Sequence, residues 1–167
     1  DSLLLDKANR FYSPLNQGVA RACLIGDLEN DGVAEVVIGE RTGEIHVFNG
    51  KTGEKKWSWK MPNTRDSYGP KICLADMDGD KRAEVYVSEG FGGSSLFVLD
   101  HHGSVILQID GNPMWDYVDQ LHAADLDDDG DDELIALGHG RLSVFDNDLA
   151  HEKWTDSATT LLEITKG

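Results

Sequence analysis

The stretch DLENDGVAE at residues 27–35 returns as DMDGDKRAE at residues 76–84 and as DLDDDGDDE at residues 125–133. The three copies begin 49 residues apart, and each has a carboxylate at positions 1, 3, 5 and 9. We call them loop one, loop two and loop three, and number the positions within each loop. A fixed period of this length indicates repeated structural units that stack side by side.

The sequence around each loop predicts four short β-strands. One apolar strand leads into the loop, a second leaves it at the glutamate of position 9, and two more follow after turns. The second strands are apolar without strict alternation, so we expect both faces of each sheet to be covered. The predicted strands are 22–25, 35–39, 45–48 and 55–59 in the first unit, 72–75, 84–88, 96–99 and 105–109 in the second, and 121–124, 133–137, 142–145 and 150–154 in the third.

Four antiparallel strands in a unit of 40–50 residues are typical of a β-propeller blade. We therefore predict an all-β fold of three four-stranded antiparallel blades, at residues 20–60, 61–110 and 111–154. Leu3–Leu5 and Leu161–Ile164 predict strands of incomplete blades or caps within residues 1–19 and 155–167. Three blades cannot close a ring, and open ends expose apolar faces. We expect the chain to belong to a longer protein or to form a homodimer that completes a ring.

The acidity of the chain is concentrated in the loops. The net charge is −16, and 15 of the 31 acidic residues lie in the three nine-residue loops. This charge argues against nucleic acid as a partner, because phosphates must be neutralised by cations. No stretch approaches 18 consecutive apolar residues, so we expect no insertion into a membrane.

The two cysteines occupy different positions of their repeats. Cys23 lies four residues before loop one, whereas Cys73 lies three residues before loop two. Because alternate residues of a strand point to opposite faces, we expect the two side chains to face opposite ways and to form no disulfide.

The spacing of the loop carboxylates predicts calcium binding. Calcium takes six to eight oxygen ligands in a tolerant geometry, and alternating carboxylates with a backbone carbonyl supply them. Glycine at position 6 of loops one and three permits the positive φ that turns the chain around an ion. Zinc would require His or Cys, and magnesium requires stricter octahedral sites. The predicted ligands are Asp27, Glu29, Asp31, Val33 and Glu35; Asp76, Asp78, Asp80, Arg82 and Glu84; and Asp125, Asp127, Asp129, Asp131 and Glu133, with position 7 (Val33, Arg82, Asp131) contributing its carbonyl.

Differences between the loops predict unequal sites. Loop three has three additional acids, so we expect it to bind calcium best. Loop two has Lys81 at position 6, where a positive φ is unusual for a residue other than glycine, so we expect it to bind worst or to be differently shaped. The alternative interpretation is that the loops are plain Asx turns without metal.

At these residues the chain resembles the FG-GAP/VCBS repeat family, which includes the calcium-binding blades of integrin α-subunit propellers. The shared pattern is Asp-x-Asp-x-Asp-Gly-x-x-Asp/Glu followed by an apolar strand, in register over residues 20–154. The resemblance implies that the acids at positions 1, 3, 5 and 9 bind Ca²⁺. The chain departs from the pattern at Glu29 and Lys81, and Phe91-Gly92 is a faint trace of the elements that name the family.

We expect a non-catalytic propeller segment that serves as an extracellular or cell-surface scaffold for interaction or adhesion, with the periplasm as the alternative location. Its partner, a protein or a glycan, is not specified by the sequence. A second hypothesis is a glycan-binding or polysaccharide-lyase-associated propeller, with a ligand site on aromatic residues of connecting segments. A third, less supported, is a quinone-type propeller, because NGKTGEKKW at 49–57 resembles the blades of that class. The aromatic candidates of the second hypothesis are Tyr68, Trp115 and Tyr117.

Overall fold

The computed structural model describes residues 4–5, 11–12, 20–62, 69–76, 78–89, 94–111, 115, 117–138, 140–146, 148–149 and 152–157. These residues include no α-helix, and accordingly the described part of the chain has no helix long and apolar enough to cross a membrane. Three sequence predictions, the C-terminal strand at residues 161–164, the Phe91-Gly92 pair and the aromatic Tyr68, fall outside the described residues.

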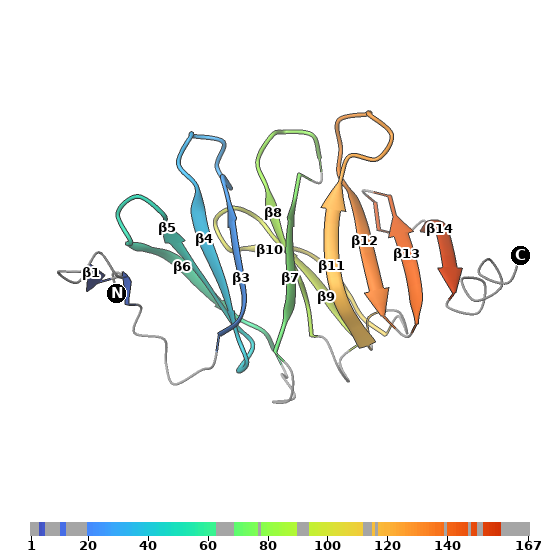
Figure 1. The fold of residues 1–167 in the computed structure, drawn as a ribbon, viewed down its shortest axis with the longest axis horizontal. Helices are drawn as coiled ribbons and strands as arrows, with labels where there is room; N and C mark the ends of the chain where they lie inside the picture. Colours follow the sequence, from blue (N-terminus) through green and yellow to red (C-terminus); the bar gives the residue numbers. More distant parts are fainter. Residues whose placement is uncertain are drawn as a thin grey trace, which may run out of the picture.

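Three four-stranded antiparallel sheets make up the fold, and in each the strands are hydrogen-bonded in chain order (Figure 1). This confirms the predicted all-β fold of three antiparallel blades. The first sheet contains β3 (Ala20–Gly26), β4 (Glu35–Glu40), β5 (Glu44–Asn49) and β6 (Lys55–Lys60). The second contains β7 (Lys71–Ala75), β8 (Glu84–Ser88), β9 (Leu96–Leu99) and β10 (Val105–Ile109). The third contains β11 (Val118–Ala124), β12 (Glu133–Gly138), β13 (Arg141–Phe145) and β14 (Glu152–Ser157).

The chain differs from prediction mainly toward its ends. Near the N-terminus, β1 (Leu4–Leu5) pairs with an unpredicted strand, β2 (Phe11–Tyr12), in a two-stranded sheet. The last strand, β14, was predicted at residues 150–154, of which 150 and 151 lie outside the described residues, and it continues to Ser157. It extends past the predicted end because it pairs with the whole of β13, from Phe145 back to Arg141.

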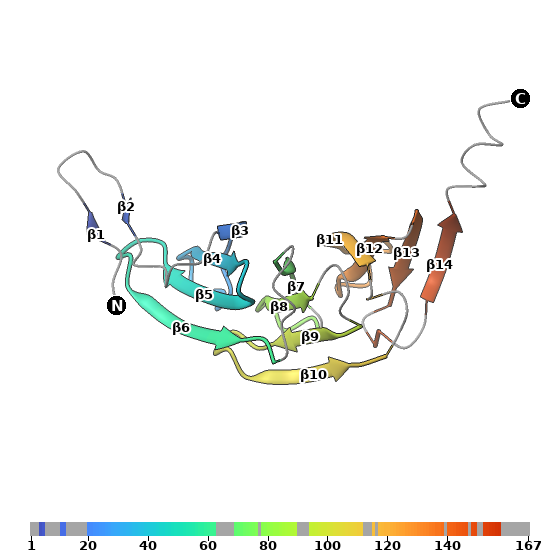
Figure 2. The same ribbon diagram turned by 90° about the horizontal axis from the view of Figure 1, so that it is seen from below.

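The three sheets lie side by side in an arc (Figure 2). The first strands of the sheets, β3, β7 and β11, lie on the concave side, whereas β6 and β10 lie on the convex side. The loops between first and second strands all project from the same edge, at the top of Figure 1. The repeat therefore brings the three acidic loops to one rim of the array.

The core is formed between successive sheets, and the middle sheet contributes to both halves of it. Val85 and Val87 of β8 pack in a cluster with the first sheet, whereas Tyr86 between them packs in a cluster with the third sheet. Phe97 and Val98 of β9 divide in the same way. Because alternate residues point to opposite faces, every residue of β8 and β9 is buried. The expectation that both faces are covered is confirmed for this sheet.

On the outer face of the first sheet, the side chains of β3 are exposed, whereas Phe48 of β5 is buried. Ile25 is 72 % exposed, whereas Leu74, at the same position of the second repeat, packs against the cluster shared with the first sheet. Cys23 on this outer face is exposed, and Cys73 is buried between the second and third sheets. Both cysteines are free, and they lie on opposite faces of their sheets, as predicted.

Candidate metal centre

The three acidic loops share one backbone conformation. Position 6 has a positive φ in each loop, 83° at Gly32 and 100° at Gly130, as predicted from glycine, and 71° at Lys81, so loop two is not differently shaped at this position. Position 4, which was not predicted, also has a positive φ in each loop. Its residues are of types that tolerate the left-handed region. They are Asn30 (55°), Gly79 (70°) and Asp128 (63°).

The same hydrogen bonds hold each loop. The position 1 carboxylate accepts a hydrogen bond from the backbone N–H of position 6, at 2.8, 2.7 and 3.1 Å in loops one, two and three. The position 5 carboxylate accepts one from the N–H of position 7, at 2.8, 2.8 and 3.0 Å. In loop one the N–H of Gly32 is the main cause that lowers the pKa of Asp27. These bonds keep the carboxylates of positions 1 and 5 directed into the loop. The acceptors are Asp27, Asp76 and Asp125 at position 1, and Asp31, Asp80 and Asp129 at position 5.

Carboxylates of positions 1, 3 and 9 converge in two of the loops. Asp76, Asp78 and Glu84 each offer an oxygen within 4.8 Å of the others, and so do their counterparts in loop three. The position 9 glutamate is buried in every loop, at 1, 6 and 0 % exposure for Glu35, Glu84 and Glu133. A buried carboxylate requires a compensating partner. The convergent set in loop three is Asp125, Asp127 and Glu133.

In loop one, the partner of the buried Glu35 carboxylate is a lysine from the fourth strand of the same sheet. Lys56 Nζ lies 2.7 Å from Glu29 Oε1 and 3.0 Å from Glu35 Oε1. The other oxygen of Glu35 accepts a hydrogen bond from the Leu28 N–H at 3.0 Å. Burial lowers the pKa of Lys56, but its hydrogen bonds to the two glutamates outweigh this effect, so the pKa is raised. The ammonium thus compensates the buried carboxylate of loop one.

Loop three repeats this arrangement. Lys153 Nζ lies 2.6 Å from Glu133 Oε1 and 2.8 Å from Asp127 Oδ2. The N–H of Leu126 donates to the other oxygen of Glu133 at 2.7 Å. Hydrogen bonds to Asp127 and Glu133 raise the pKa of Lys153, and the same contact lowers that of Asp127. Neither lysine was identified from the sequence, although the pair Lys-Trp at residues 56–57 and 153–154 was a signal.

Loop two differs from the other two loops, and its residues suit a bound cation. Oδ1 of Asp76 is buried and has no hydrogen-bond partner among the described residues. Such an orphaned acceptor is costly unless something satisfies it. The convergent groups here are all carboxylates, which suit a hard divalent ion such as Ca²⁺. Asp76, Asp78 and Glu84 would hold the ion.

Backbone and side-chain hydrogen bonds join neighbouring loops. The Ala83 N–H of loop two donates to the Leu28 carbonyl of loop one at 3.2 Å. Asp132 of loop three donates its N–H to the Asp76 carbonyl at 3.0 Å and accepts the Asp76 N–H on Oδ2 at 2.9 Å. A Cβ on Gly79 would lie only 2.5 Å from Asp131 Oδ1. Two of the additional acids of loop three are therefore directed at loop two.

Comparison with known proteins supports the repeat. Residues 27–87 match the family model described as FG-GAP-like repeat. The match spans loops one and two and ends in β8, so it includes the orphaned Asp76 oxygen. No match was found among curated protein sequences.

Solved structures with the same arrangement of sheets are similar in fold. The structure of BBS1N in complex with ARL6DN is 14 % identical with a TM-score of 0.61, covering 82 % of this chain and 39 % of that one. The WD40 domain of Pan2 from Neurospora crassa is 15 % identical with a TM-score of 0.59, covering 87 % and 41 %. BamB from Moraxella catarrhalis is 21 % identical with a TM-score of 0.53, covering 88 % and 39 %. The chain spans about two fifths of each of these structures.

The two described aromatic candidates for a ligand site differ in their burial. Trp115 is fully buried and stacks on Phe145 with ring centroids 5.1 Å apart, in the cluster between the second and third sheets. Its ring is a packing element, and no face of it is available to a sugar. Tyr117 is 36 % exposed. The glycan-binding hypothesis therefore gains no support from Trp115.

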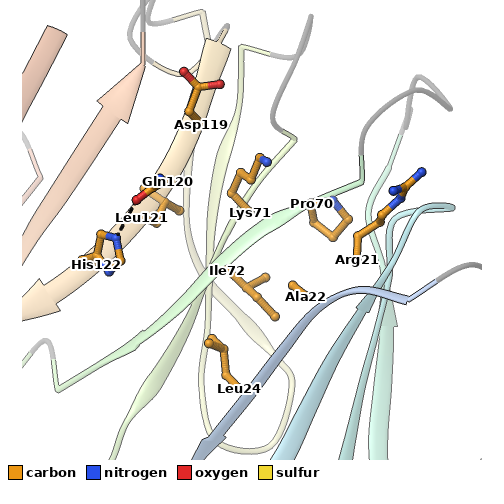
Figure 3. Close-up of a pocket in the computed structure, with 10 residues that line it drawn as sticks. All are labelled: Arg21, Ala22, Leu24, Pro70, Lys71, Ile72, Asp119, Gln120, Leu121 and His122. Carbon is orange, nitrogen blue, oxygen red and sulfur yellow. Dashed lines mark hydrogen bonds between the residues drawn. The ribbon is translucent and has the colours of Figure 1, made fainter. Parts of the chain in front are cut away.

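A shallow hollow of about 500 Å³ lies across the first strands of the three sheets (Figure 3). Arg21 from β3, Lys71 from β7 and Asp119 from β11 lie around it. Ile72 and Leu24 line the part between the first two sheets. The sequence did not predict this surface, which combines residues from all three repeats. It lies on the concave side, away from the acidic rim.

One further polar group, also missed from the sequence, lies in the hairpin between β4 and β5. Glu40 and His46 are 0 and 4 % exposed, and His46 Nε2 lies 3.1 Å from Glu40 Oε1. Thr42 Oγ1 donates to the second oxygen of Glu40 at 3.2 Å. Both Glu40 oxygens are thus engaged, whereas the buried His46 Nδ1 has no hydrogen-bond partner among the described residues. Glu40, Glu44 and His46 each offer an atom within 4.8 Å of the others, so they too could hold a metal ion.

Proposed function

We propose that the chain is a Ca²⁺-binding β-propeller segment that acts as a non-catalytic extracellular scaffold for interaction or adhesion. The observation that carries the proposal is loop two, where three carboxylates converge within 4.8 Å and one buried Asp76 oxygen has no hydrogen-bond partner in the described part of the chain. When bound, the ion supplies two positive charges that compensate the convergent carboxylates.

The chemistry of the loop favours calcium over other metals. Its convergent groups are carboxylates, and neither His nor Cys occurs in any of the three loops. Zinc sites are built mainly on such nitrogen and sulfur ligands, whereas calcium accepts oxygen ligands in irregular geometry. Asp78 and Asp80 are exposed to solvent. Such an open site suits the weak affinity of extracellular calcium modules, with Kd of about 10⁻⁴–10⁻³ M.

A structural role for the ion follows from the position of the loops. Loop two lies between loops one and three and is hydrogen-bonded to both. An ion held there would stabilise the contact of three successive blades. The resulting rigid rim would serve a protein or glycan partner. A net charge of −16 disfavours nucleic acid in that role.

The exposed side chains of β3 on the outer face of the first sheet support a further part of the proposal. Ile25 is 72 % exposed where a preceding blade would cover it. We propose that further blades, from a longer protein or from a second copy, pack against this strand. Light scattering of the 167-residue chain distinguishes the two, since a stable monomer would contradict the homodimer.

Calcium titration tests the proposal. We expect isothermal titration of the chain with CaCl₂ to show binding, and the melting temperature to rise with calcium and to fall with a chelator. Asp78→Asn in loop two should abolish the rise, because it removes an exposed carboxylate of the convergent set. Asp119→Asn, at an exposed position outside the loops, is the matched control. An unchanged melting curve in calcium would contradict the proposal.

A further inference from the structure

The fourth strand of each sheet has a β-bulge at the same place. In β6, Lys55 and Trp57 pair with consecutive residues of β5 and leave Lys56 unpaired. In β14 the skipped residue is Lys153, and in β10 it is Ile106. A bulge leaves one extra residue outside the ladder and redirects its side chain. The three repeats thus place one residue each at an equivalent position beside the acidic loop.

In loops one and three this residue delivers an ammonium to the carboxylates. Lys56 bridges positions 3 and 9 of loop one at 2.7 and 3.0 Å. Lys153 bridges positions 3 and 9 of loop three at 2.8 and 2.6 Å. Two of the carboxylates that would bind a cation in each loop are therefore already bound to a positive charge of the chain.

The neighbouring residue holds the bulge in place. Trp57 Nε1 donates a hydrogen bond to the His101 carbonyl of the second sheet at 2.8 Å. The Trp57 ring also lies against Gly103, where an added Cβ would be 2.7 Å from the ring. Lys56 is thus presented from an anchored segment, which limits the rearrangement open to its side chain.

Loop two receives no charge from its bulge. The equivalent residue, Ile106, is apolar and 53 % exposed. The carboxylates of loop two lie in the same arrangement, with one buried oxygen of Asp76 that lacks a hydrogen-bond partner among the described residues. One feature that separates the loops is therefore the bulge residue of the fourth strand. Loop two also differs within the loop, where Lys81 and Arg82 occupy positions 6 and 7.

We infer that the bulge residue of the fourth strand decides whether an acidic loop takes a divalent cation. Loop two is then the calcium site of this chain, whereas Lys56 and Lys153 prevent calcium binding in loops one and three. This rests on the proposed calcium-binding function. A cation that enters loop one or three must displace an ammonium from the same two carboxylates. It must also approach against the repulsion of a like charge a few ångströms away. In loop two neither cost arises from the fourth strand. The loop's own Arg82 lies 3.5 Å from Asp80 at position 5, which is outside the convergent set.

Exchange of the bulge residues tests the inference. Calcium titration of the full chain should show one site in the unaltered protein, and that site should be removed by Asp78→Asn. Lys153→Met and Lys56→Met should each add one site, with affinity for the opened loop raised at least tenfold. Ile106→Lys should weaken the loop two site at least tenfold. Because Ile106 is half exposed, this variant removes little packing and tests the idea even where the methionine variants fail to fold.

Charge-conserving variants provide the control. Lys153→Arg and Lys56→Arg retain the positive charge and should add no site. Three equal sites in the unaltered chain, unchanged by the methionine variants, would overturn the inference and leave the proposed function standing. An Ile106→Lys variant that binds calcium as tightly as the unaltered chain would also overturn it. Absence of binding in the unaltered chain and in every variant would instead overturn the proposed function, and the inference with it.

Discussion

Loop two and loop three have the same backbone path and the same convergent carboxylates at positions 1, 3 and 9, yet different groups stand beside them. Loop three has the ammonium of Lys153 on two of its carboxylates, whereas Ile106 occupies the equivalent position beside loop two. Loop three also directs Asp132 toward Asp76 of loop two. The comparison shows that the charge balance of such a loop depends on the fourth strand and on the neighbouring blade.

The largest effect is expected where a lysine-compensated loop loses its buried carboxylate. Glu35→Ala should lower the free energy of unfolding by about 3 kcal/mol, because it leaves the Leu28 N–H without its acceptor and removes one partner of a partly buried ion pair. Chemical denaturation measures the loss. Glu54→Ala, an exposed residue of the β5–β6 turn, should change stability by less than about 0.5 kcal/mol. Equal losses in both variants would contradict the structural role of Glu35.

The next effect separates the loops by their response to calcium. With free calcium at about a hundred times Kd, binding should add about 2.7 kcal/mol to the stability of the unaltered chain. Glu84→Gln in loop two should remove most of this gain. Glu133→Gln in loop three should lower stability without calcium and leave the calcium-dependent gain in place. Denaturation with and without calcium measures both, and loss of the gain in both variants would show that loop three also binds the ion.

A smaller effect concerns position 6. Lys81 has a φ of 71°, where the sister loops have glycine. A left-handed conformation costs an ordinary residue roughly 1–2 kcal/mol, and glycine avoids this cost. Glycine is also more flexible in the unfolded chain, which offsets about 0.5–1 kcal/mol of that gain. Lys81→Gly should therefore stabilise the chain by up to about 1 kcal/mol. Lys51→Gly, in a turn where the lysine has no positive φ, should not stabilise it. The same gain in both variants would exclude backbone strain as the cause.

The smallest effect should appear at the extremes of pH. Lys153 lowers the pKa of Asp127 in the folded protein below the ordinary value of 3.8. The ionised Asp127 therefore stabilises the fold above about pH 3.8, and this stabilisation is lost as the pH falls through its lowered pKa. The pKa of Lys153 is raised above 10.5, so its contribution is present below that pH and is lost as the pH rises through the folded value. Lys153→Met should flatten the stability profile in both windows. An unchanged profile, measured by denaturation at each pH, would contradict the ion pair.

Much of the fold follows from local features of the sequence. Strands β8, β9 and β10 have the predicted bounds, because turn residues and runs of apolar side chains delimit them. The positive φ at position 6 follows from glycine in two copies and from the repeat in the third. The sequence also indicates the convergence of positions 1 and 9, since the loop between two paired strands is short.

The partners of those loops were decided by tertiary structure. The ranking expected from loop composition alone, with loop three first, took no account of Lys153, which a bulge in the fourth strand brings to Glu133. Trp115 lies in the core because the third sheet packs against the second. Asp132 accepts a hydrogen bond from the Asp76 N–H of loop two because the second and third blades lie side by side. A nine-residue pattern fixes which oxygens converge, because hydrogen bonds within the loop hold them. Which positive charge meets those oxygens depends on strand register and blade packing, which bring together residues far apart in the chain.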